Sequence, residues 1–114
     1  MTNLATTTAT IETLTNTINQ VISAATHQIT HLDEQVAESG YRSLLHYERD
    51  QYARAAAILE VFEEAHMYLT EPRDQDQAIA AAYQVAVRTL ARTQSERGNE
   101  LTRHAAVELL TIFH

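Results

Sequence analysis

The stretch that decides the fold is residues 41–69, YRSLLHYERDQYARAAAILEVFEEAHMYL. A seam recurs along it at alternating steps of three and four residues, the spacing of a helix that packs along its whole length. The seam consists of Tyr41, Leu45, Glu48, Tyr52, Ala55, Leu59, Phe62, His66 and Leu69. It predicts one amphipathic helix over 41–69, roughly 40 Å long. A helix of this length suits the axis of an elongated bundle.

Two polar residues, Glu48 and His66, interrupt this seam. A buried charge is costly unless it is paired, so each side chain needs a partner or a path to water. Two interpretations stay open. The positions are half exposed, or they serve as a specificity device or a ligand site.

The remaining chain predicts three more helices and one tail. Residues 1–9 are threonine-rich and are expected to be a disordered N-terminal tail, and residues 10–114 form a single helical-bundle domain. Apolar residues at helical spacing predict a first helix over about 10–38, which ends at Ser39-Gly40. Its apolar positions are Ile11, Leu14, Ile18, Val21, Ile22, Ala25, Ile29, Leu32 and Val36.

Two further breaks divide the C-terminal half. Residues 70–74 contain Pro72, which cannot continue a helix, and Asp74 is suited to cap the next one. Residues 96–99 contain Gly98 and form the third break. The helix between these breaks should bury Ile79, Tyr83, Ala86, Val87 and Leu90. The last helix ends in the apolar run LLTIF, which should dock on the bundle or on another chain.

The fold class that follows is all-α. With 2 glycines, 1 proline and no alternating β-branched run, the sequence predicts an elongated antiparallel four-helix bundle. Helices 1 and 2 are long, and helices 3 and 4 are shorter. If the long pair projects beyond helix 4, apolar surface is left that homodimerisation would cover.

Composition excludes several functional classes. The chain has no cysteine, which excludes disulfides, thiolate chemistry and cysteine zinc sites. The N-terminus lacks the basic and apolar regions of a signal peptide, and no apolar run approaches the ~20 residues of a membrane span. We therefore expect a cytoplasmic protein without a membrane span.

Charge argues against nucleic acid as a partner. The formal net charge is -7, and residues 33–76 carry eleven acidic side chains against four arginines. An acidic middle repels phosphate backbones and anionic membranes.

A metal site is the first candidate chemistry. His27, His31 and Glu34 lie one turn apart on one helix face. Folding the hairpin about Gly40 sets position 34 opposite about 46, which brings His46 and Asp50 near this face. The predicted ligands are His27, His31, Glu34 and His46. The alternative is that these histidines are solvated, and the sequence itself calls for no cofactor.

A second metal pattern is Glu63-x-x-His66, the element found in carboxylate-bridged di-iron bundles. A di-iron site needs two such elements and two further carboxylates, so a dimer would have to supply the missing half. A metal-binding, ferritin-like helical dimer is therefore an alternative function.

An acidic group surrounds the second break. Its members are Glu60, Glu63, Glu64, Glu71, Asp74 and Asp76. A run of charge is usually a solvated face, and its functional interpretation is a docking surface for a basic protein.

Catalysis has no support in the sequence, because it contains no phosphate-binding glycine loop and no nucleophile elbow. We expect a small acidic helical protein-interaction module, non-catalytic and of the inhibitor, immunity or adaptor kind, that forms a homodimer and binds a further protein. In size and helix layout the predicted bundle is similar to bacteriocin-immunity bundles, and no residue role is transferred from them. A small DNA-associated regulator, with helix 3, Gly98 and helix 4 as a helix-turn-helix, is the other alternative.

Overall fold

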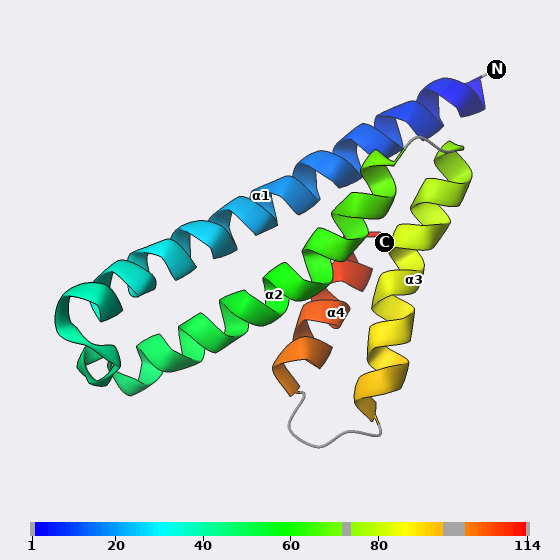
Figure 1. The fold of residues 1–114 in the computed structure, drawn as a ribbon. Coiled ribbons are helices and arrows are strands. Elements are labelled where there is room, and N and C mark those ends of the chain that lie inside the picture. The colour runs from blue at the N-terminus through cyan, green and yellow to red at the C-terminus, as the bar shows by residue number, and fades with distance from the viewer. Residues whose placement is uncertain (1, 72–73, 95–99, 114) are drawn as a thin grey trace.

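The computed structural model describes residues 2–71, 74–94 and 100–113, with the backbone alone over residues 2–10. Within this part the chain is all α, as predicted. The helices are α1 (Thr2–Ser39), α2 (His46–Thr70), α3 (Gln75–Gln94) and α4 (Glu100–Ile112), with a short 3-10 helix, η1 (Tyr41–Ser43), between the first two. The bundle is elongated, with extents of 58 × 31 × 21 Å (Figure 1).

Helix α2 is the central element of the bundle. It packs against α1 on one side and against both α3 and α4 on the other, whereas α1 makes few contacts with α3 and α4 (Figure 1). The buried residues of α2 begin at Ala55, so its first two turns have no cover from α3 or α4. The hairpin of α1 and α2 therefore projects past the other two helices as a two-helix arm, residues 25–54.

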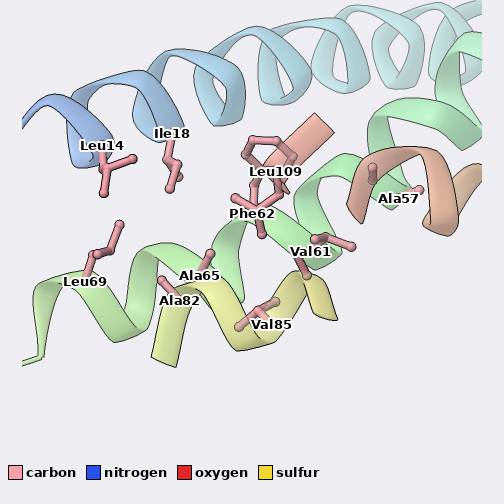
Figure 2. Close-up of a cluster of buried hydrophobic side chains, with 12 residues drawn as sticks. Leu14, Ile18, Ala57, Val61, Phe62, Ala65, Leu69, Ala82, Val85 and Leu109 are labelled. Carbon is pink, nitrogen blue, oxygen red and sulfur yellow. The ribbon is translucent and has the colours of Figure 1, made fainter. Parts of the chain in front are cut away.

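The main core surrounds Phe62, which is fully buried in the middle of α2. All four helices contribute to this cluster (Figure 2). Its other members are Leu14, Ile18, Ala57, Val61, Ala65, Leu69, Ala82, Val85, Ala86, Ala105 and Leu109. The alanines matter because small side chains let helix axes approach closely around the few large ones. The arm has its own seam, which consists of the buried residues Ala25, Leu32 and Leu44.

The buried stripe of α3 differs from the predicted one. Ala86 is buried as expected, but Ile79, Tyr83 and Leu90 are half-buried and Val87 is exposed. The line of closest approach instead holds small residues, which are Ala78, Ala82, Val85, Ala86, Thr89 and Thr93. The larger apolar side chains flank this line because they do not fit between closely packed helices.

The two buried threonines of α3 are satisfied within their own helix. The Thr89 hydroxyl donates to the Val85 carbonyl at 2.7 Å, and the Thr93 hydroxyl donates to the Thr89 carbonyl at 2.8 Å. Buried hydroxyl groups without partners would cost stability, and these bonds remove that cost.

The C-terminal apolar run docks on its own bundle, which was one of its two predicted destinations. Phe113 packs edge-to-face on Tyr83 of α3, with ring centroids 5.7 Å apart and an interplanar angle of 84°. This contact joins the chain end to the helix beside it.

The start of α2 is the main correction to the sequence prediction. The helix expected from Tyr41 begins at His46, because Gly40 has a φ of 80° and the chain then makes the η1 turn. Leu44 is buried beneath this connection. Tyr41 and Leu45, which were placed in the seam, are 58% and 56% exposed.

Because α2 begins at His46, Glu48 can cap the start of the helix. It lies in the first turn of α2, where its Oε1 accepts a hydrogen bond of 2.9 Å from the Leu45 backbone N–H. A carboxylate at this position also interacts favourably with the helix dipole. Glu48 is therefore a capping residue at a half-buried position, and His66 is also half-buried.

The other boundaries differ in how well they agree. Helix α1 begins at Thr2, about eight residues before the predicted start near Thr10, and the disorder expected over 1–9 stays a prediction. Helix α3 begins directly after Asp74, the predicted cap. Pro72, Arg73 and the break at 96–99 lie outside the described residues.

Truncation of Phe62 tests the core. Phe62→Ala should lower the free energy of unfolding by about 3–5 kcal/mol, since it leaves a cavity among all four helices. Phe62→Leu should cost less and keep the protein folded for measurement by urea denaturation. Val107→Ala, at an exposed position of α4, should change stability by less than about 0.5 kcal/mol. Equal losses for Phe62→Leu and Val107→Ala would contradict the placement of the core.

Substitution of Glu48 tests the cap. Glu48→Ala should lower stability by about 1 kcal/mol, because it removes a hydrogen bond and a charge that favours the helix dipole. Glu48→Gln keeps an acceptor and should lose less. Glu108→Ala, an exposed glutamate within α4, is the matched control for thermal unfolding. A rise in the melting temperature of Glu48→Ala would show that the carboxylate is an uncompensated charge.

Candidate functional site

One side of the α1–α2 hairpin, here called the open face, lies away from α3 and α4. On α2, the cluster shared with those helices uses Ala57, Val61 and Ala65. A second stripe runs along the opposite side of α2, at alternating steps of four and three residues. Its members are all exposed or half-buried, and they are Leu45, Arg49, Tyr52, Ala56, Leu59 and Glu63.

Helix α1 carries a matching stripe. Ile22, Ile29 and Val36 recur every seven residues and are half-buried, with Thr26 and Asp33 exposed between them, and Ile22 also packs against the edge of the main core cluster. Asp33 is hydrogen-bonded to the side chain of Tyr52, which shows that the two stripes lie on the same side of the hairpin. The open face is therefore one continuous surface with apolar residues along both helices.

The contact between Asp33 and Tyr52 has an electrostatic consequence. The hydrogen bond to the Asp33 carboxylate raises the pKa of Tyr52 above its ordinary value, and the negative charge of Asp33 and partial burial act in the same direction. The neutral phenol is the form that links the two helices of the arm.

Arg49 lies at the edge of the open face, near the tip of the arm. Its guanidinium carbon sits 4.8 Å from the centroid of the Tyr41 ring, a cation–π distance. Its Nε is buried without a hydrogen-bond partner, and within the described residues Arg49 forms no ion pair. The tip thus presents a cation and, in Tyr41, Leu45 and Tyr47, three exposed large hydrophobic residues.

The predicted metal ligands His27, His31, Glu34 and His46 are all exposed. They were grouped by folding the hairpin directly about Gly40. The Asp33–Tyr52 contact shows a different register, in which Glu34 lies opposite about residue 51, so His46 is displaced toward the tip by more than one helical turn. The displacement arises because η1 and two extended residues precede α2. His46 approaches Asp50 instead, at 3.7 Å.

No three histidine, aspartate or glutamate side chains converge on a possible metal position within the described residues. The Glu63-x-x-His66 element has an exposed carboxylate and a half-buried imidazole on α2. The metal hypotheses stay predictions, and one chain does not assemble either set of ligands.

The acidic group around the second break is partly neutralised. Glu64 faces Arg88 at 3.5 Å, and Glu60 faces Arg92 at 3.9 Å, so both acids join α2 to α3. Glu63, Asp74 and Asp76 are exposed, and Glu71 is half-buried. The interpretation of all six as one docking surface for a basic protein stays a prediction.

A shallow pocket lies beside these ion pairs. Its volume is about 130 Å³, and it is lined by Glu64, Val85, Arg88, Thr89 and Arg92. Pockets that enclose small-molecule ligands usually have volumes of about 300–1,000 Å³. This pocket is therefore too small to hold a typical substrate.

Comparisons of this chain with protein-family models, with curated proteins and with solved structures give no match. None of the described helices combines the length and the apolar character needed to cross a bilayer.

The sequence prediction missed the open face, although its signal is present. The seam that includes Glu48, Tyr52 and Ala55 accounts for only one side of α2. A second heptad row, Arg49, Ala56 and Glu63, runs beside it and is visible in the same residues.

The Tyr52–Asp33 contact predicts a loss of stability in alkali. Because the pKa of Tyr52 is raised in the folded state, its contribution is fully present below the ordinary tyrosine pKa, about 10, and is lost as pH rises through the folded value. The melting temperature of Tyr52→Phe should fall less steeply between neutral pH and pH ~11 than that of the unmodified protein. Tyr47→Phe, at an exposed position, should keep the original steepness. The same slope for all three proteins would contradict this assignment.

Proposed function

We propose that this chain is a non-catalytic protein-interaction module and that the open face is its binding surface. The observation that carries the proposal is the stripe of exposed and half-buried residues on each helix of the hairpin, most of them apolar, which the packing within the chain leaves only partly covered. Contiguous apolar surface on a small protein commonly marks the site of a partner.

A partner would bury more of the apolar surface of the arm than of the rest of the bundle. Two helices can bury only the seam between them, and Ile29 and Val36 stay half-buried for this reason. Burial of apolar surface is worth about 25 cal/mol per Å². A partner with an apolar helical surface would supply the cover that α3 and α4 give to the other half of the hairpin.

The residue types on this surface also favour protein binding. Tyrosine, methionine and arginine are enriched in protein interfaces. Tyr41, Arg49 and Tyr52 lie on or beside the open face, and Met67 lies at its far end. The partners we propose are a second copy of the chain, giving a homodimer, and a further protein bound by the same module.

The other functional classes have less support from the described residues. An enzyme of small molecules needs a larger pocket than the one beside Arg88. The metal-binding and DNA-associated alternatives lack an assembled ligand set and a basic surface, respectively.

Site-specific photo-crosslinking in cells of the native host tests the proposal. Benzoylphenylalanine at Leu45, on the open face, should give discrete crosslinked protein species. The same group at Val107 is the matched control, because Val107 is similarly exposed but lies on α4. Crosslinking at Val107 that equals that at Leu45, or none at Leu45 and Ala56, would overturn the proposal.

A further inference from the structure

We infer that the open face binds a second copy of this chain, with the two hairpins face to face and antiparallel, about a two-fold axis that passes by Ile29 and Ala56. This inference rests on the proposed function and assigns its partner. It follows from a symmetry in the order of side chains along the open face.

The symmetry on α2 is centred at Ala56. Arg49 and Glu63 lie seven residues on either side of it, and Leu45 and Met67 lie eleven residues on either side. When two copies of α2 pack antiparallel about Ala56, Arg49 of each copy meets Glu63 of the other, and Leu45 of each copy meets Met67 of the other. Both pairs are complementary, one in charge and one in apolar character.

The symmetry on α1 is centred at Ile29, which lies level with Ala56 along the hairpin. Asp33 is hydrogen-bonded to Tyr52, and Ile29 and Ala56 each lie four residues farther from the tip on their own helix. Ile22 and Val36 lie seven residues on either side of Ile29. One two-fold axis therefore pairs apolar residues on α1 and complementary residues on α2 together, as an isologous interface requires.

The groups that this arrangement pairs lack those partners within one chain. Leu45 and Met67 are 56% and 46% exposed. Neither Arg49 nor Glu63 forms an ion pair with any other described residue. Ala56 is small and exposed, which lets the two copies of α2 approach at the axis.

The area is sufficient for a dimer. The open face from Leu45 to Met67 is about 35 Å long, and two helices side by side are about 20 Å wide. The buried surface is then about 700 Å² per copy, close to the ~800 Å² per partner of a standard protein interface. Helices α3 and α4 lie on the other side of α2 and leave this approach free (Figure 1).

A cysteine at the axis tests the arrangement, because the chain has no cysteine of its own. Ala56→Cys in the full chain should form a disulfide between copies under mild oxidation. Ala91→Cys, also exposed but on α3, is the matched control and should stay monomeric on a non-reducing gel. Circular dichroism of the reduced proteins confirms that both variants fold.

Charge exchange gives the second measurement, by sedimentation equilibrium from about 1 to 200 μM. Arg49→Glu should weaken the dimer by about tenfold or more. The substitution places a glutamate opposite Glu63 of the other copy, and the two-fold symmetry makes two such repulsive pairs. Glu63→Arg should do the same, and Arg49→Glu with Glu63→Arg should restore association. Added salt should weaken the unmodified dimer.

Three results would overturn the inference. The first is a monomer over the whole concentration range. The second is a dimer in which Ala56→Cys and Ala91→Cys crosslink equally. The third is rescue of Arg49→Glu by Asp33→Arg instead of Glu63→Arg, which would show parallel hairpins. If the chain is monomeric but Leu45 crosslinks to a different protein in cells, the proposed function stands and only the identity of its partner is wrong.

Discussion

The bundle depends on one constraint, which is that α2 must pack on two sides at once. It packs against α1 along one seam and against the α3–α4 pair along another, and Phe62 lies where all four helices meet. Alanines on α2 and α3 make this possible because they let neighbouring axes come close around a single large ring. Since α1 makes few contacts with α3 or α4, it is held mainly by α2, whereas α3 and α4 pack on α2 and on each other.

The sequence was sufficient to predict the helices and most of their faces. Heptad spacing located the buried residues Leu14, Ile18, Phe62 and Leu69, because an amphipathic helix must turn its apolar side toward the core. The start of α2 was wrong, since Tyr41 and Leu45 fit the same period as the true seam. Periodicity alone cannot show that a glycine of positive φ and a short 3-10 turn interrupt the helix there. That five-residue difference then changed the register of the hairpin and separated His46 from His31 and Glu34.

The candidate site was harder to predict because it depends on what the fold leaves uncovered. The stripe of Arg49, Ala56 and Glu63 is readable in the sequence, but a helix with apolar residues on several sides has more than one way to pack. Only the placement of α3 and α4 on one side shows which stripe stays open. The acidic residues show the same limit, since the sequence could not reveal that Glu60 and Glu64 face arginines of α3.

The pattern of helix contacts also bears on how the chain reaches its folded state. Most contacts join helices that follow one another in sequence, α1 with α2, α2 with α3 and α3 with α4. Contacts between successive helices close shorter loops than contacts between distant ones, so less entropy is lost before each contact stabilises the next. Helical bundles in which such contacts dominate are among the faster-folding proteins. The two-helix arm is a local hairpin by itself, and it can form before α3 and α4 dock on the far half of α2.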